Sequence, residues 1–163
     1  MMTTGLIDLA TQLGEALKQK RWMLAVAESC TGGGIANACT AIPGSSEWFE
    51  RGFVTYSNRA KTEMLGVPAE LIQRHGAVSE EVARAMATGA LQHSPASIAV
   101  AVTGIAGPGG GSPTRPVGTV WFAWGAKGES VSTLHSQFDG DRAMVRAQST
   151  RFAIERLIAE LVR

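Results

Sequence analysis

The sequence has few of the residues that build disulfide frameworks and metal centres. Its two cysteines, Cys30 and Cys39, form no CxxC motif and no framework of paired cysteines, which favours a reduced, cytoplasmic setting. The three histidines, His75, His93 and His135, are scattered without metal-ligand spacing, and no HExxH motif occurs. We therefore expect no bound catalytic metal.

Strong charge and long apolar segments are also missing. A formal net charge of +1 gives no electrostatic footprint for nucleic acid or for a membrane surface, so neither partner is expected. No apolar run reaches the roughly 18–20 residues of a membrane span, and the N-terminal segment lacks the pattern of a secretory signal. A length of 163 residues, 45% of them hydrophobic, predicts one domain over residues 1–163 with a sizeable core.

The stretch Leu24–Gly34, which reads LAVAESCTGGG, is the centre of the expected fold. An apolar run that ends in polar residues and glycines, before the helix-like segment Ile35–Thr40, predicts a buried strand, a tight turn and a helix. Ser29 then lies at the carboxyl end of the strand, where open α/β sheets bind ligands. The turn also leaves backbone N–H groups open to an anion or a developing oxyanion. Its candidate binding residues are Thr31, Gly32 and Gly33. A turn that merely needs flexible glycines is the alternative.

Helices and buried strands alternate along the chain. Helical spacing and capping residues predict helices over 4–20, 35–40, 59–65, 68–74, from Ser79 through Gly89, and over 141–163. Short apolar runs predict strands over 22–27, 53–56, 97–102, 117–126 and 131–138. The last two strands form a hairpin at Lys127-Gly128-Glu129. This order predicts a three-layer α/β/α sandwich with a mixed, mostly parallel sheet of about five strands.

Polar segments follow three of these strands: Ser29, residues 56–61, and the glycine-rich loop 103–111. The carboxyl ends of parallel strands share one edge of a sheet, so we expect the three segments to meet there. The loop could wrap a phosphate or a ribose, with Thr103, Gly104 and Gly107 as candidate contacts. It does not match the GxxxxGK[ST] nucleotide loop, because no lysine follows its glycines, and an ATPase or GTPase is therefore not expected.

Lys61 is an unusual residue for its position. Ser57 and Asn58 are both good N-cap residues. With Asn58 as the N-cap, Lys61 would lie in the first turn of a helix, where the helix dipole and burial both lower the pKa of an amine. A neutral lysine is a competent general base for a serine hydroxyl. The alternative is a side chain that simply extends to solvent. Tyr56, the only tyrosine, either relays a proton or is a solvated strand-end aromatic.

Arg142 also occupies an unfavourable position, at the start of the last helix. A cation there suggests a bound anion, and a guanidinium group can donate two hydrogen bonds to a phosphate. A surface ion pair with Asp139 or Asp141 is the alternative. Cys30 is a second candidate nucleophile beside Ser29, but successive side chains point in different directions, and such a cysteine is more often a small buried filler. We favour Ser29.

Five motifs carry a resemblance to a known family. They are AESCTGG (27–33), GSSEWFERGFVTYSNRAK (44–61), HGAVSEEVA (75–83), TGIAGPGGG (103–111) and PVGTVWFA (116–123). Together they resemble the CinA C-terminal domain family, and within it the stand-alone nicotinamide-nucleotide amidohydrolases. The resemblance covers nearly the whole chain. It implies a three-layer α/β/α sandwich and a homodimer or larger homo-oligomer.

The resemblance also implies a reaction. Family members of this kind hydrolyse the carboxamide of nicotinamide mononucleotide (NMN) to nicotinic acid mononucleotide and ammonia, in pyridine-nucleotide salvage and without a cofactor. Carried onto this sequence, Ser29 is the nucleophile, Lys61 the general base and Tyr56 an assisting group. The substrate-binding candidates that the resemblance adds or supports are Ser46, Thr103 and, for the phosphate, Arg142; Asn58 completes the set. A nucleotide-binding relative without catalysis is the alternative function.

Overall fold

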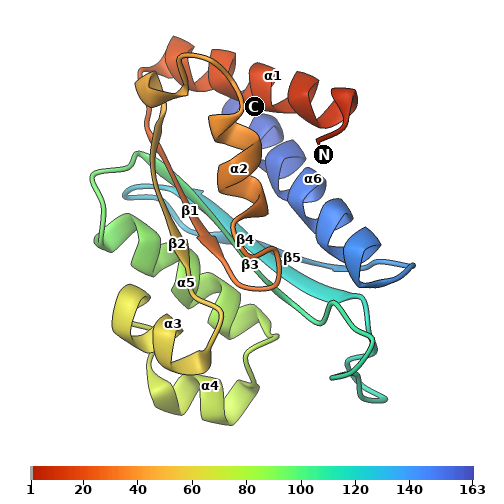
Figure 1. Cartoon of the computed structure of the whole chain (residues 1–163). Helices are drawn as coiled ribbons and strands as arrows, with labels where there is room; N and C mark the ends of the chain where they lie inside the picture. The colour runs from red at the N-terminus through yellow and green to blue at the C-terminus, as the bar shows by residue number, and fades with distance from the viewer. Residues whose placement is uncertain (1) are drawn as a thin grey trace.

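The computed structural model describes residues 2–163 and shows a twisted sheet with helices on both faces (Figure 1). Its five strands are β1 (Leu24–Glu28), β2 (Phe49–Val54), β3 (Ile98–Gly104), β4 (Thr119–Ala126) and β5 (Ser132–Gln137), in the spatial order β2-β1-β3-β4-β5. β1 pairs in parallel with both β2 and β3. β4 is antiparallel to β3 and to β5, so β5 runs in the direction of the first three strands. The expected mixed, mostly parallel sheet is confirmed.

The helices form the outer two layers of the sandwich. One face carries α1 (Thr4–Lys20), α2 (Gly34–Thr40) and α6 (Arg142–Leu161), and the other carries α3 (Asn58–Leu65), α4 (Ala69–His75) and α5 (Glu80–Gln92). The expected first helix agrees with α1 at both ends. Of the described residues, none belongs to a helix that is long and apolar enough to cross a membrane.

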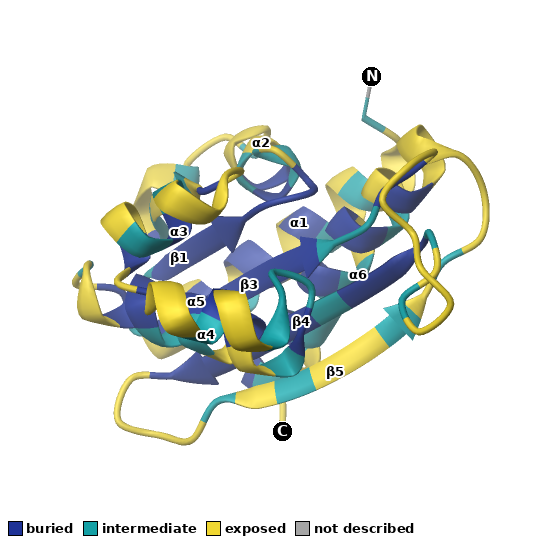
Figure 2. Ribbon diagram, turned by 90° about the horizontal axis from the view of Figure 1, so that it is seen from below, coloured by how far each residue is buried: buried dark blue, intermediate teal, exposed yellow. Residues whose placement is uncertain are grey.

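The central strands are buried on both faces (Figure 2). In β3, Val100 and Val102 face the layer of α1, α2 and α6, whereas Ala99 and Ala101 face the layer of α3, α4 and α5. Small side chains on the second face let its helices approach closely. A Cβ atom on Gly89 of α5 would lie 2.0 Å from a backbone oxygen of α3, so these two helices meet backbone to backbone. This close contact fixes the position of α3 against α5.

Two boundaries differ from the sequence expectation in a way that matters for the site. β2 spans Phe49–Val54 rather than the expected 53–56: it begins four residues earlier, and it ends at Val54 because its register against β1 stops where β1 stops, at Glu28. The N-cap of α3 is Ser57, whose Oγ accepts the N–H of Ala60 at 3.0 Å, rather than Asn58.

Candidate active site

A pocket of about 270 Å³ lies at the carboxyl edge of β1, β2 and β3. All three polar segments that follow these strands contribute to its wall, as the topology predicts. The predicted site residues among its lining are Ser29, Tyr56, Asn58, Lys61, Thr103, Gly104, Gly107 and Arg142. Residues separated by more than a hundred positions in the chain thus share one cavity.

Lys61 and Ser29 are in direct contact inside this pocket. Nζ of Lys61 lies 3.0 Å from Oγ of Ser29 and also donates to the backbone carbonyls of Thr55, at 3.0 Å, and Tyr56, at 3.2 Å. Lys61 is only 1% exposed, and its partners are all neutral oxygens. Burial without a carboxylate lowers the pKa of the lysine below its usual 10.5, because the charged form loses its hydration. A lysine of this kind can lose its proton and act as a base.

The cause of this shift differs from the one that the sequence suggested. Because α3 begins at Asn58, Lys61 lies one position beyond the first turn, and its N–H already bonds to the carbonyl of Ser57. Burial of the amine is therefore the principal cause of the lowered pKa. The position of Lys61 on α3 matters because it lets the side chain reach back past the helix start to the end of β1.

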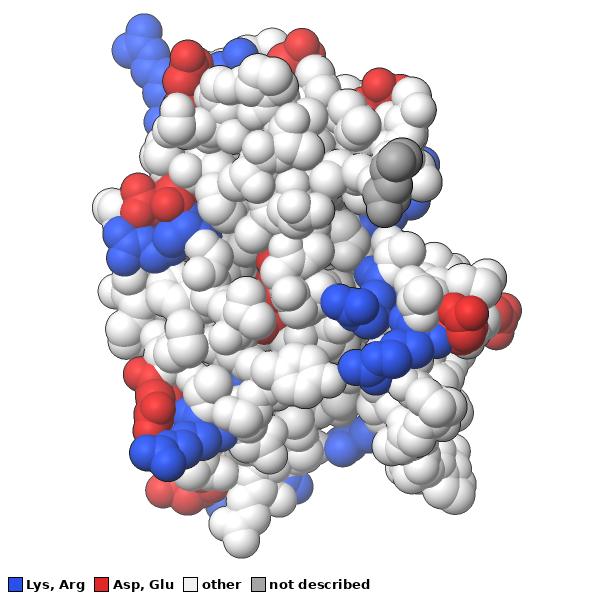
Figure 3. Space-filling view, in the orientation of Figure 1, with Lys and Arg blue, Asp and Glu red and all other residues white. Residues whose placement is uncertain are grey.

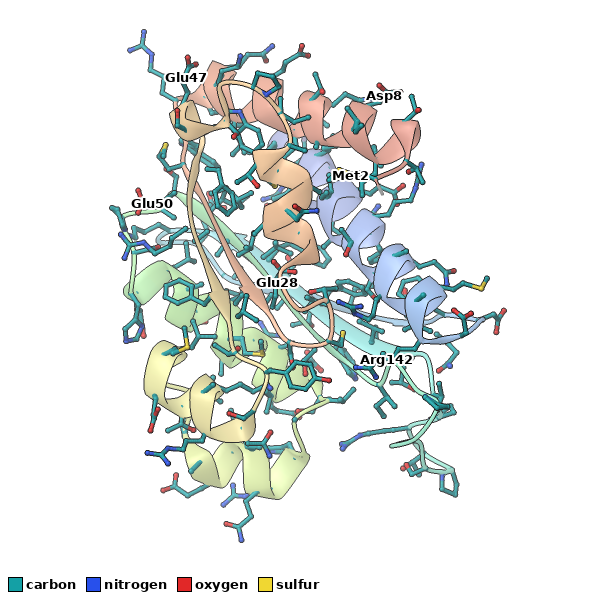
Figure 4. All side chains as sticks on the ribbon, viewed as in Figure 1. Met2, Asp8, Glu28, Glu47, Glu50 and Arg142 are labelled. Carbon is teal, nitrogen blue, oxygen red and sulfur yellow. The ribbon has the colours of Figure 1, made fainter. Side chains whose placement is uncertain are left out.

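Glu28, which sequence reasoning missed, organises the turn that carries Ser29. Its carboxylate is fully buried and accepts three hydrogen bonds, from the hydroxyl of Thr31 at 2.6 Å and from the N–H groups of Ile35 at 2.9 Å and Ala36 at 3.0 Å. Figure 4 shows it between the end of β1 and the start of α2. Glu28 thus caps α2 from seven residues upstream. The sequence signal that could have identified Glu28 is its position: it is a lone carboxylate at the end of an apolar strand, before a glycine-rich turn.

Glu28→Gln is expected to lower the free energy of unfolding by about 1–3 kcal/mol. The amide can still accept hydrogen bonds through its oxygen, but its NH₂ group then faces a backbone N–H that has lost its acceptor. Chemical unfolding followed by circular dichroism measures the change. Glu47→Gln is the matched control, because Glu47 is exposed. Equal stability of the two variants would show that the buried carboxylate does not hold the turn.

The hydrogen bonds within the glycine-rich turn occupy some of the N–H groups that were expected to bind an anion. The N–H of Gly32 bonds to the carbonyl of Ser29, and the N–H of Gly34 bonds to that of Thr31, each at 3.0 Å. Neither group is open to a ligand, and Thr31, Gly32 and Gly33 do not line the pocket. Over residues 2–163, the N–H groups of the turn that have no hydrogen-bond partner are those of Cys30, Thr31 and Gly33. Of these three residues, Cys30 lines the pocket.

Arg142 joins two segments across the mouth of the pocket. Its Nη1 donates to the carbonyl of Gly107 at 2.8 Å, and its Nη2 donates to the hydroxyl of Tyr56 at 2.9 Å. Asp141 instead caps α6 through the N–H of Met144. Within the described part of the chain Arg142 makes no ion pair, so the surface pair with Asp139 or Asp141 does not form. Figure 4 shows Arg142 at the start of α6, and basic atoms gather there on the surface in Figure 3.

The remaining predicted residues divide between the pocket and elsewhere. Thr103 is buried at the end of β3, where its hydroxyl donates to the carbonyl of Ala77 at 2.9 Å. Tyr56 is 60% exposed at the rim, with its backbone carbonyl rather than its hydroxyl on Lys61. Ser46 lies in a 3₁₀ turn, Ser45–Glu47, that precedes β2 and therefore occupies the opposite, amino edge of the sheet. The structure does not bring Ser46 to the pocket.

Cys30 is poorly suited to act as the nucleophile. Burial raises the pKa of its thiol to about 11, so that the thiol stays protonated at neutral pH. The thiolate is the reactive form of cysteine. No group of three or more His, Cys, Asp or Glu residues suited to a metal ion occurs in the part of the chain that the structure describes.

The fold and the pocket define a three-layer α/β protein with a buried serine–lysine pair at the carboxyl edge of a mixed sheet. Residues 6–161 match the CinA C-terminal domain. The chain belongs to this family.

Individual relatives match almost from end to end. The nicotinamide-nucleotide amidohydrolase PncC of Pseudomonas putida is 57% identical over 150 residues, which cover 92% of this chain and 93% of that protein. PncC of Escherichia coli K12 is 52% identical over 158 residues, with 96% and 95% covered. The crystal structure of competence/damage inducible protein CihA from Agrobacterium tumefaciens superposes with a TM-score of 0.96 at 46% identity and covers 100% of this chain and 99% of that one.

Proposed function

We propose that this protein hydrolyses the carboxamide of NMN, giving nicotinic acid mononucleotide and ammonia. The observation that carries the proposal is the buried contact between Lys61 Nζ and Ser29 Oγ at 3.0 Å, a nucleophile beside a base of lowered pKa. The near-full-length similarity to amidohydrolases that act on nicotinamide nucleotides supports the substrate. The reaction would serve pyridine-nucleotide salvage.

The two residues divide the acyl transfer into two steps. Neutral Lys61 takes the proton of Ser29 while Oγ attacks the carboxamide carbon, and the carbonyl oxygen becomes an oxyanion. The C–N bond then breaks, and protonated Lys61 gives its proton to the nitrogen, which leaves as ammonia; the hydroxyl of Tyr56, expected to assist, is bonded to Arg142 instead. A water molecule, deprotonated by the same lysine, attacks the acyl ester, and Ser29 leaves with the proton. The carbonyls of Thr55 and Tyr56 hold the ammonium form between these transfers.

The oxyanion needs hydrogen-bond donors that are in place before the reaction. The N–H of Cys30 belongs to the residue after the nucleophile, makes no hydrogen bond to another of the described residues, and belongs to the pocket wall. One such donor contributes about 2.7–4 kcal/mol to the stability of the transition state. We assign the oxyanion to the N–H of Cys30 rather than to Gly32 or Gly34.

The nucleotide part of the substrate fits the outer pocket. Arg142 uses two of its five N–H donors on Gly107 and Tyr56, so others remain for a phosphate. Gly104 and Gly107 place backbone groups in the wall of this outer part, and Asn58 and Thr103 complete the polar wall.

Arg142→Ala is expected to raise KM for NMN by about 10- to 100-fold, because a charge-assisted hydrogen bond contributes about 1.5–3 kcal/mol. The effect on kcat should be smaller. Steady-state kinetics of ammonia release measure both. Nicotinamide riboside, which lacks the phosphate, is the matched control substrate. Its kcat/KM should be unchanged by the substitution, and an equal loss with both substrates would contradict a role in phosphate binding.

The proposed function is tested by incubating the purified protein with NMN and measuring ammonia and nicotinic acid mononucleotide in equal amounts. In H₂¹⁸O the new carboxylate should carry one heavy oxygen, as hydrolysis requires. Binding of NMN without release of ammonia would contradict the enzyme and favour the non-catalytic nucleotide-binding protein.

A further inference from the structure

We infer that Arg146 of α6 is a positioning residue that holds the turn after Ser29 in place and so fixes the N–H of Cys30, the proposed oxyanion donor. The inference rests on the proposed function and extends it to a residue outside the pocket wall. Arg146 lies one helical turn after Arg142 and contacts the turn that carries the nucleophile.

The contacts of Arg146 fall on two successive carbonyl groups. Its Nε donates to the carbonyl of Cys30 at 3.0 Å, and its Nη2 donates to the carbonyl of Thr31 at 3.3 Å. The two carbonyls are held by two nitrogens of one planar guanidinium, whose fork has fixed geometry. Cys30 and Thr31 lie 116 and 115 residues before Arg146, so these hydrogen bonds are long-range tertiary contacts rather than a local helix cap.

A carbonyl that is fixed at one end of a peptide group fixes the N–H at the other end. The peptide unit is planar and trans, so its C=O and N–H point in opposite directions. By holding the carbonyl of Cys30, Arg146 directs the N–H of Thr31 away from α6. The preceding N–H, that of Cys30, is directed in the same way by the bond between the Ser29 carbonyl and the N–H of Gly32. Arg146 and the bond between Gly32 and Ser29 thus fix the two peptide groups that flank Cys30, whose N–H belongs to the pocket wall.

The turn is shaped to accept the arginine at close range. Gly32 has φ +56°, and a Cβ atom there would lie only 3.3 Å from Nη2 of Arg146. A side chain at this position would therefore both strain the backbone and press on the guanidinium. The positive charge also acts at the turn: burial raises the pKa of the Cys30 thiol, and Arg146 opposes that increase.

Loss of Arg142 and loss of Arg146 should therefore change different kinetic constants. Arg142 reaches the substrate end of the pocket, and its loss should appear in KM. Arg146 hydrogen-bonds to backbone carbonyls of the turn that carries the nucleophile. Its loss should therefore appear in kcat, because the oxyanion forms during the chemical step.

Arg146→Ala is expected to lower kcat for NMN by about 10- to 100-fold, which is at most the decrease caused by removing an oxyanion donor. KM should change less than about threefold. Arg146→Lys should remain impaired, because one ammonium group cannot hold two carbonyls in the geometry of the fork. Arg151→Ala is the matched control on the same helix, since Arg151 is an exposed residue paired with Glu155. Wild-type kcat in Arg146→Ala, or full activity in Arg146→Lys, would overturn the inference.

A second readout separates positioning from folding and from the choice of substrate. A fluorophosphonate probe forms a tetrahedral adduct on Ser29 whose oxygen occupies the same donors, and the rate of labelling is followed by intact mass, with Ser29→Ala as the blank. The rate should fall in both Arg146 variants at an unchanged melting temperature. Unchanged labelling rates would overturn the inference. If wild type is labelled at Ser29 but releases no ammonia from NMN, the proposed substrate is wrong, and the labelling rates of the variants still decide the role of Arg146.

Discussion

Lys61→Ala is expected to lower kcat for ammonia release from NMN by about a thousandfold, within the usual range for a general base. No other titratable side chain of the described residues contacts Oγ of Ser29. Without the amine, the hydroxyl keeps its proton during the attack, and the leaving group receives none. KM should change little, because Lys61 bonds to Ser29 and to backbone carbonyls rather than to the nucleotide.

The matched control for this variant is Lys18→Ala, which removes an exposed lysine of α1 and should keep wild-type rates. Lys61→Met keeps the length of the side chain and separates loss of the base from loss of packing. Both Lys61 variants should remain folded, as judged by circular dichroism. Near-normal turnover by either one would show that Lys61 is not the base.

The lowered pKa of Lys61 gives the activity a defined pH dependence. Only the neutral amine accepts the proton of Ser29, so kcat/KM should fall as the pH falls through the lowered pKa of Lys61 and should level off above it. The midpoint is expected below 10.5, the ordinary value for lysine. The same shift acts on stability: between the lowered pKa and 10.5 the unfolded chain binds more protons than the folded one, so stability rises with pH in that window. A pH–rate profile that shows no fall toward low pH with a midpoint below 10.5 would contradict the assignment.

The sequence predicted the fold well because its strongest patterns are local. Two short apolar runs, the one before Ser29 and the one in β3, are typical of strands that are buried on both faces. Such strands require helices above and below the sheet. The carboxyl edge then follows from topology, which is why the sequence alone predicts Ser29, Lys61 and Thr103 at one edge of the sheet.

The parts that the sequence did not reveal depend on long-range contacts. The hydrogen bonds of Arg146 join positions more than a hundred residues apart, and nothing in the local pattern of α6 distinguishes that arginine from its neighbours. Glu28 caps a helix that begins at the third of three successive glycines, so no ordinary N-cap signal marks it. The resemblance alone suggests Ser46 as a binding residue, and the direction of β2 places it at the other edge of the sheet.

Ser29→Ala is expected to lower kcat by about four to six powers of ten, which is the scale of loss when a nucleophile is removed from a set of groups that act together. Lys61 would remain in place but would have no hydroxyl to activate. The fold should be kept, because the change removes one oxygen and leaves Lys61 with its two carbonyl partners. Release of ammonia is the measurement, with binding of NMN by calorimetry as evidence that the pocket is intact.

Cys30→Ala is the matched control, because it alters the neighbouring residue and leaves Ser29 unchanged. Its thiol is protonated at neutral pH, so the variant should keep kcat within about threefold of wild type and lose only a small amount of buried packing. Rapid quenching of wild type with NMN should in addition reveal an acyl adduct on the peptide that contains Ser29, and the adduct should be absent from Ser29→Ala. Full activity in Ser29→Ala together with loss of activity in Cys30→Ala would transfer the nucleophile to Cys30. Full activity in both would require a water molecule that attacks the carboxamide directly, with Lys61 as its base.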